Sequence, residues 1–183
     1  MSKDSSRRKF IQQLSSTALL FGAGSLERLQ AEEKIEERIM QYNRNYLSND
    51  KIRLAVIGTG IQGHNDLEAA LKVPGVELAG ACDLYIGRLE RMKELYGNGL
   101  FVTRDYRELL LRKDIDAVIV ATSDHYHARI ATDAMKAGKH VYCEKPMVHS
   151  ILEGPAVIKA QKESGKVFQV GSQGVSSLGN EKA

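Results

Sequence analysis

The clearest chemical signal in the sequence is a glycine-rich loop that follows a short apolar run at residues 52–57. In such a loop the first glycine permits a tight turn, and the second lets the backbone approach a pyrophosphate. The third allows a helix to pack closely on a strand. The N–H groups that open the following helix lack partners within it and can bind an anion. The glycines predicted to shape this dinucleotide-binding loop are Gly58, Gly60 and Gly63.

An acidic residue follows the glycine loop at the spacing expected for binding the adenosine ribose. Asp83 follows a second apolar run, residues 76–82, about 20 residues after the loop, the spacing at which an acidic side chain hydrogen-bonds the ribose hydroxyls. Its charge favours NAD over NADP because it repels a 2′-phosphate, although Arg88 could compensate if it folds over the adenosine. The alternative is that Asp83 only closes a turn at the strand end. We therefore predict NAD, with NADP possible.

Two further polar segments follow predicted strands, and ligands bind at the carboxyl edge of a parallel sheet. The segments are Thr122-Ser123-Asp124-His125-Tyr126-His127 and Glu144-Lys145-Pro146. His125 and His127 could ligate a metal ion, but no third ligand follows at usable spacing, so no metal site is predicted. Cys82 and Cys143 match no zinc or iron–sulfur spacing and are expected to be buried. His64, His140 and His149 have no predicted role.

Placing these segments together requires strands and helices in alternation. After Lys51, short β-branched runs alternate with longer stretches of helical period, as in a parallel sheet covered by helices on both faces. The predicted strands span residues 52–57, 76–82, 100–103, 116–121, 140–143 and 167–170. Helices are expected to start near Gln62, Tyr85, Asp105, His125 and Ile151, and to end near Gly97, Gly138 and Gly165. The predicted fold class is α/β, a Rossmann doubly wound parallel sheet over residues 51–174.

The motifs also resemble a known family. The glycine loop, ATSDHYH at residues 121–127 and AMKAGKHVYCEKP at residues 134–146 are similar to the Gfo/Idh/MocA family of glucose-fructose oxidoreductase, inositol dehydrogenase and rhizopine-catabolism proteins. The resemblance covers roughly residues 51 to 174, and Glu-Lys-Pro is the family's hallmark. Ser123 departs from it, because the family usually carries a proline there, which leaves the turn less fixed. Serine is compatible with a turn or a helix start.

The resemblance implies roles for individual residues. It places Ile61 and Gln62 against the pyrophosphate and Asp83 on the ribose. The residues that it places beside the nicotinamide half of the cofactor are Thr122, Ser123, Asp124, His125 and His127. We expect His127 to orient its loop by hydrogen bonding, and Gln173 to contact the cofactor.

The resemblance further implies that Glu144 and Lys145 approach the nicotinamide ribose and the reacting carbon, with a cis bond before Pro146. Lys145 is the predicted catalytic residue, because an ammonium beside a carbinol can hydrogen-bond its oxygen and help it lose its proton as hydride leaves. The alternative is a surface cation at a strand end.

The first fifty residues differ in character from the rest. Ser6-Arg7-Arg8-Lys9-Phe10-Ile11 precedes a weakly apolar stretch, residues 14–23, which is too short to span a bilayer. This resembles a twin-arginine signal peptide over residues 1–31, whereas the alternative is a disordered basic amino terminus. Residues 32–50 carry Ile35, Ile39 and Tyr42 at helical spacing and are expected to form an amphipathic arm or linker. We therefore expect export, to the periplasm or beyond.

Composition excludes one class of partner. The chain has 26 basic and 23 acidic residues and a formal charge of +3, and basic residues nowhere alternate with aromatic ones. A nucleic acid is therefore not an expected partner, and no membrane span is predicted.

The family implies a second, C-terminal α+β domain that supplies an acid–base Asp and His and binds the substrate. Only residues 175–183 follow the predicted Rossmann domain, so we expect that domain to be absent and the chain alone to be inactive. The parent protein is expected to be a homo-oligomeric oxidoreductase that transfers hydride between NAD(P) and a sugar or cyclitol hydroxyl. The alternatives are an NAD-dependent glycoside hydrolase that uses transient oxidation and a non-catalytic binding module.

Overall fold

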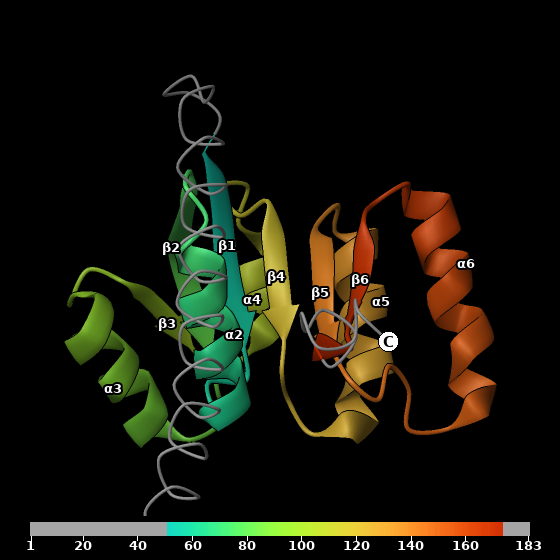
Figure 1. The fold of residues 1–183 in the computed structure, drawn as a ribbon, viewed down its shortest axis with the longest axis horizontal. Coiled ribbons are helices and arrows are strands. Elements are labelled where there is room, and N and C mark those ends of the chain that lie inside the picture. Colours follow the sequence, from blue (N-terminus) through green and yellow to red (C-terminus); the bar gives the residue numbers. More distant parts are fainter. Residues whose placement is uncertain (1–50, 174–183) are drawn as a thin grey trace, which may run out of the picture. The chain divides into compact units, whose positions relative to one another are not determined.

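The computed structural model describes residues 51–173 (Figure 1). The expected signal peptide at residues 1–31, the expected arm at 32–50 and the segment at 175–183 lie outside the described residues. The predicted Rossmann domain falls within them except for its last residue.

The described residues form one parallel sheet of six strands. They are β1 (Ile52–Ile57), β2 (Val76–Cys82), β3 (Phe101–Thr103), β4 (Ala117–Val120), β5 (His140–Glu144) and β6 (Phe168–Gly171). The spatial order is β3-β2-β1-β4-β5-β6, so the direction of winding reverses between β1 and β4. This confirms the doubly wound sheet. The first two strands have the predicted bounds, and the other four differ by one residue at one or both ends.

Five helices connect the strands; the first three begin within one residue of the predicted starts, and the last two begin two and three residues later than predicted. They are α2 (Ile61–Leu71), α3 (Ile86–Tyr96), α4 (Tyr106–Leu111), α5 (His127–Lys136) and α6 (Gly154–Ser164). Two of them follow short 3₁₀ turns, η2 (Asp124–Tyr126) and η3 (Ile151–Glu153). Gly97 and Gly165 cap α3 and α6, and Gly138 follows the cap of α5 with a φ of 79°.

The last helix begins later than its hydrophobic pattern suggests because its entry is capped. The Ser150 side chain accepts a hydrogen bond from the Leu152 N–H, and Glu153 accepts from the Ser150 N–H at 3.1 Å. This capping box holds Ile151–Glu153 in a tight 3₁₀ turn, and α6 follows from Gly154.

The helices form two layers that cover opposite faces of the sheet. Along β1, Leu54 and Val56 pack on the side of α2 and α3, whereas Ala55 and Ile57 pack on the side of α4, α5 and α6. Figure 1 shows α2 in front of β1 and α5 behind β5. Because both faces are covered, the last four residues of β1 are all buried and read as one apolar run.

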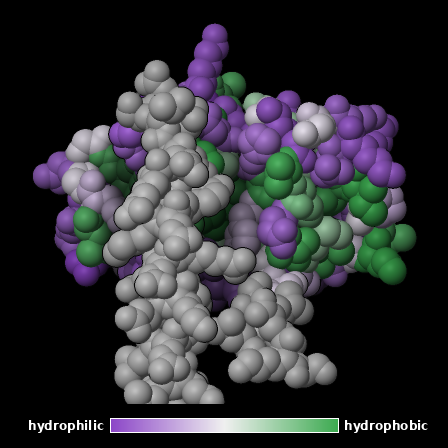
Figure 2. Space-filling model, turned by 45° about the horizontal axis from the view of Figure 1, so that its top comes forward, coloured by the Kyte–Doolittle hydropathy of each residue, from purple (hydrophilic) through white to green (hydrophobic). Residues whose placement is uncertain are grey.

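The α2 and α3 layer does not reach β5 and β6 (Figure 1). Figure 2 shows hydrophobic atoms at the surface where β5, β6 and α6 lie. Val167 and Ile158 contribute exposed apolar side chains in this part of the chain. Among the described residues, no helix is long and apolar enough to cross a bilayer.

Candidate functional site

The glycine loop makes the first part of the site, at the carboxyl end of β1. Gly58 has a φ of 93°, and a Cβ there would lie 2.5 Å from the carbonyl oxygen of Ala121. A Cβ on Gly63 would overlap the carbonyl oxygen of Gly58. The two glycines therefore let β1, the first turn of α2 and the end of β4 approach closely.

Gly60 is different, because nothing in the described protein requires it to be small. A Cβ there would meet only the Arg88 guanidinium, at an ordinary contact distance of 3.7 Å. The first N–H groups of α2 receive no side-chain cap from Gly60, and the neighbouring Ile61 is 85% exposed. The lack of a side chain at Gly60 and the uncapped N–H groups suit an anionic ligand that lies against the backbone.

An open pocket of about 390 Å³ lies against this loop. It is lined by Thr59, Gly60, Ile61, His64, Asn65 and Arg88. A larger hollow of about 580 Å³ lies among α3, β2 and β3, and its lining contains none of the predicted site residues. Three predicted cofactor-binding residues, Gly60, Ile61 and Arg88, line the loop pocket, so it is the candidate cofactor site.

Asp83 lies beside the loop and holds it. Its Oδ2 accepts hydrogen bonds from the Thr59 N–H at 2.9 Å and from Arg88 at 3.3 Å, and its Oδ1 accepts from the Tyr85 N–H at 2.9 Å. Burial alone would raise the pKa of Asp83, but the two backbone N–H groups and the Arg88 guanidinium lower it. The carboxylate therefore closes the turn after β2 and also fixes the glycine loop. The Arg88 guanidinium lies over Gly60 and lines the loop pocket.

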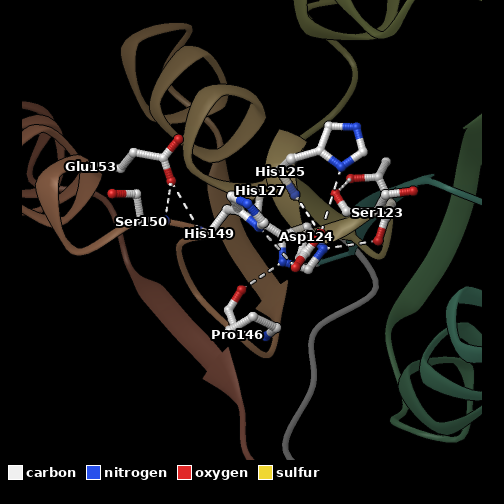
Figure 3. A network of polar contacts seen from close by, with 9 residues as sticks. Ser123, Asp124, His125, His127, Pro146, His149, Ser150 and Glu153 are labelled. Carbon is white, nitrogen blue, oxygen red and sulfur yellow. Dashed lines mark hydrogen bonds and ion pairs between the residues drawn. The ribbon is translucent and has the colours of Figure 1, made fainter.

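The loop after β4 is tied to the loop after β5 by one buried histidine. The His127 ring is 2% exposed, with Nδ1 2.8 Å from the Pro146 carbonyl oxygen and Nε2 3.0 Å from the Thr122 carbonyl oxygen (Figure 3). The predicted orienting role of His127 thus has a structural basis. Ser123 has a φ of −68°, close to the value that proline imposes, so the departure from the family keeps the same backbone.

A second contact between these loops was not predicted. Asp124 Oδ2 lies 3.1 Å from His149 Nδ1, and its Oδ1 lies 3.6 Å from His125 Nδ1 (Figure 3). The hydrogen bond from His149 lowers the pKa of Asp124. His149 thus joins the site, and its isolated position in the sequence gave no signal. His140 accepts a hydrogen bond from the Val167 N–H instead.

The Glu-Lys-Pro segment ends β5 with one buried and one exposed charge. Glu144 is 3% exposed, and its Oε2 accepts a hydrogen bond from the Lys145 N–H at 3.2 Å. Lys145 is exposed at the same edge, and no ion pair within residues 51–173 engages its ammonium. The Lys145–Pro146 bond is cis, as the resemblance implies. Lys145 is therefore available to a ligand at this edge.

A cluster of polar side chains surrounds Glu144. The Gln173 amide donates to its Oε1, and the Gln62 amide lies 3.5 Å from the same atom. Asp66, which was not predicted, accepts from Gln62 at 2.8 Å. Burial raises the pKa of Asp66, and the charge of Glu144 raises it further. Gln173, predicted to contact the cofactor, therefore lies where β1, β5 and β6 end.

The cysteines are buried, as predicted. Burial raises the pKa of both thiols, Cys82 and Cys143, to about 12. The described residues contain no group of three or more side chains suited to hold a metal ion.

The comparison with known families decides the assignment. A model described as an oxidoreductase family with an NAD-binding Rossmann fold, Gfo/Idh/MocA, matches residues 52–172. The chain belongs to this family. The match confirms the family that the motifs indicated, together with its NAD-binding Rossmann fold.

Individual Gfo/Idh/MocA relatives differ in their named activities. The chain is 33% identical to the inositol 2-dehydrogenase of Salmonella typhimurium over 122 residues, which are 66% of this chain and 36% of that protein. It is 36% identical over 110 residues to a glycosyl hydrolase family 109 protein of a Shewanella species, covering 56% of this chain and 24% of that protein. The chain thus spans about a third or less of these relatives.

A solved structure of the family shows the same fold. The WlbA dehydrogenase of Chromobacterium violaceum, in complex with NADH and a UDP-sugar acid, UDP-GlcNAcA, superposes with a TM-score of 0.68 at 27% identity. The match covers 74% of this chain and 39% of that one.

Proposed function

We propose that the chain is the NAD-binding half of an exported oxidoreductase that transfers hydride between NAD and a sugar or cyclitol hydroxyl. The observation that carries the proposal is that one sheet edge joins the close-packed glycine loop, the half-buried Asp83 and the exposed Lys145. The inositol 2-dehydrogenase and the WlbA dehydrogenase named above support the substrate class.

The site residues fit a dinucleotide in their chemistry. The uncapped N–H groups of α2 would bind the pyrophosphate, and Asp83 would accept hydrogen bonds from the adenosine ribose. NAD, once bound, accepts or supplies the hydride. The Lys145 ammonium would hydrogen-bond the substrate oxygen and favour loss of its proton. His127 and Glu144 would hold the two loops that carry these groups.

The cofactor preference rests on charge. Asp83 is held ionised by four hydrogen bonds, from the N–H and hydroxyl of Thr59, the Tyr85 N–H and Arg88, so a 2′-phosphate beside it would be repelled. Arg88 already pairs with Asp83 at 3.3 Å. The positive charge of Arg88 is therefore partly neutralised and would attract a 2′-phosphate less strongly. We therefore infer a preference for NAD over NADP.

A second candidate is favoured by the Shewanella relative, whose name is that of a glycosyl hydrolase. In that case hydride would pass from one substrate carbon to NAD, the aglycone would be eliminated as an alcohol, water would add in its place, and the same hydride would return to the sugar, with no net redox change. Such an enzyme retains its NAD between turnovers, whereas a dehydrogenase exchanges it.

Export, the second domain and self-assembly complete the proposal. The twin-arginine pattern supports export, because that route carries folded proteins with their cofactors. The relatives are about three times as long as the matched segment, which supports a C-terminal domain that binds the substrate. A homo-oligomer is proposed for the full protein.

Fluorescence titration of the full chain with NADH and NADPH tests the proposal. We expect saturable binding of NADH, and weaker binding of NADPH by about tenfold or more, the effect of one close like charge. Asp83→Asn should narrow the difference, and Asp114→Asn, at an exposed carboxylate away from the site, should not. Equal or stronger binding of NADPH would contradict the NAD preference, and no binding of either by a folded chain would contradict the proposed function.

A further inference from the structure

Two carboxyl groups from distant segments meet at the end of β5. Asp66 lies on α2, one turn after Gln62, and Glu144 ends β5. The Gln62 amide nitrogen lies 2.8 Å from Asp66 Oδ1 and 3.5 Å from Glu144 Oε1. The Gln173 amide nitrogen bridges the same two atoms, 3.5 Å from Asp66 Oδ1 and closer to Glu144 Oε1. Two neutral amides thus hold two acids together.

The surroundings offer little to compensate two negative charges. Glu144 is 3% exposed, and Asp66 Oδ2 is buried with no hydrogen-bond partner. Within residues 51–173, no Lys, Arg or His forms an ion pair with either carboxylate. The groups that face Asp66 are Glu144 and Tyr142 on β5, Gln173 after β6 and Gln62 on its own helix. Two adjacent carboxylates with only neutral donors cannot both ionise readily.

We propose that Asp66 holds its proton beside the Glu144 carboxylate, and that this proton sets the preference of the site for reduced over oxidised NAD. The inference rests on the proposed function and on the resemblance, which places Glu144 beside the nicotinamide ribose. The oxidised ring carries a positive charge and the reduced ring carries none. A negative charge on Asp66 therefore favours NAD⁺, and the proton on Asp66 favours NADH. Asp66 acts through Glu144 as a positioning and specificity residue.

The direction of the pH effect follows. Burial raises the pKa of Asp66 above its usual 3.8, and the charge of Glu144 raises it further. Below this raised pKa Asp66 holds its proton, and above it Asp66 is ionised. The ratio of the NADH dissociation constant to that of NAD⁺ should therefore rise with pH. The expected rise is about fivefold, the effect of one charge in a half-exposed site.

Asparagine is the informative substitution at position 66, because Asp66 Oδ2 has no hydrogen-bond partner that the substitution would remove. Asp66→Asn keeps the shape of the side chain and the acceptor for Gln62, and it cannot ionise. Its ratio of dissociation constants should stay at the low-pH value of the wild type at every pH. A purely structural role would leave the pH dependence in place and change both affinities together.

Calorimetric titration of the full chain with NAD⁺ and with NADH, between about pH 4 and pH 9, tests the inference, with ¹³C NMR titration of the Asp66 carboxyl carbon alongside. The proposal expects a rising ratio in the wild type and in the control Asp114→Asn, and a flat one in Asp66→Asn. It also expects Glu144→Gln to lower the NMR midpoint of Asp66.

Several outcomes would overturn it. A flat ratio in the wild type, or the same rise in Asp66→Asn, would remove the link to the cofactor. An Asp66 midpoint at the ordinary value, unmoved by Glu144→Gln, would show that Asp66 does not hold its proton beside Glu144. Failure to bind either cofactor would instead refute the proposed function and the inference with it, and the NMR result would separate the two failures.

Discussion

Replacing Asp83 by asparagine should destabilise the fold as well as weaken binding. The wild-type carboxylate accepts from the Thr59 N–H and Arg88 through one oxygen and from the Tyr85 N–H through the other. Asparagine offers only one oxygen, so its amide N–H₂ must face a donor on one side. Hydrogen bonds to a charged group contribute about 1.5–3 kcal/mol each, and a buried donor left without an acceptor costs about 1–3 kcal/mol. We therefore expect the free energy of unfolding at pH 7 to fall by about 3 kcal/mol.

The same reasoning predicts how this loss depends on pH. The pKa of Asp83 is lower in the folded chain than the ordinary value of 3.8, so its contribution is fully present above that value. It is lost as the pH falls through the folded pKa, because the protonated acid itself presents an O–H to a donor. The difference between wild type and Asp83→Asn should therefore be largest at neutral pH and shrink below about pH 4.

Urea denaturation followed by circular dichroism at several pH values measures this difference. Asp114→Asn is a control, because its carboxylate pairs with Arg112 near the surface, and such pairs contribute about 1 kcal/mol or less. A loss below about 1 kcal/mol for Asp83→Asn at pH 7, or a loss equally large in acid, would refute the assigned role of Asp83 in holding the glycine loop.

Three further predictions concern the loops and the core. Gly63→Ala should abolish saturable NADH binding and lower the free energy of unfolding by about 1–3 kcal/mol, because its Cβ would overlap the Gly58 carbonyl oxygen; titration and urea melts check this, and unchanged binding would contradict it. His127→Ala should cost about 3 kcal/mol in the same melts, because it empties a buried site and removes the hydrogen bond by which the imidazole joins the two loops; a cost under about 1 kcal/mol would show that the loops hold without it. Cys82 and Cys143, with pKa values raised to about 12, should react with a disulfide reagent at pH 8 at least about 100-fold more slowly in the folded chain than in denaturant; fast labelling of native protein would contradict their burial.

The sheet could be predicted from the sequence because its strands are buried on both faces. The continuous apolar run at residues 52–57 and the glycine loop after it define β1 and its end without reference to any distant segment. The entries to α5 and α6 were predicted less well. Asp124–Tyr126 and Ile151–Glu153 satisfy a helical pattern, yet they form 3₁₀ turns, and the distinction lies in local hydrogen bonds such as those of Ser150.

The site was predicted where a motif names its residues and missed where a contact joins distant ones. Asp66 meets Gln173 across 107 positions of the chain, and His149 meets Asp124 across 25. Neither residue stands in a recognised spacing. The cluster of Asp66, Glu144 and the two glutamine amides becomes apparent only once the ends of β5 and β6 lie side by side. The dual role of Asp83 was likewise hidden, because its bond to Thr59 spans the first crossover.

Mapping NAD⁺ onto the full chain by amide chemical shifts tests the central claim most directly. The account predicts that NAD⁺ shifts the resonances of Gly58–Gly63, Asp83, Thr122–His127 and Glu144–Lys145, all at the carboxyl edge of the sheet. Shifts confined to the larger hollow among α3, β2 and β3, around Tyr96 and Phe101, would contradict it, as would a folded chain with no shifts at saturating NAD⁺.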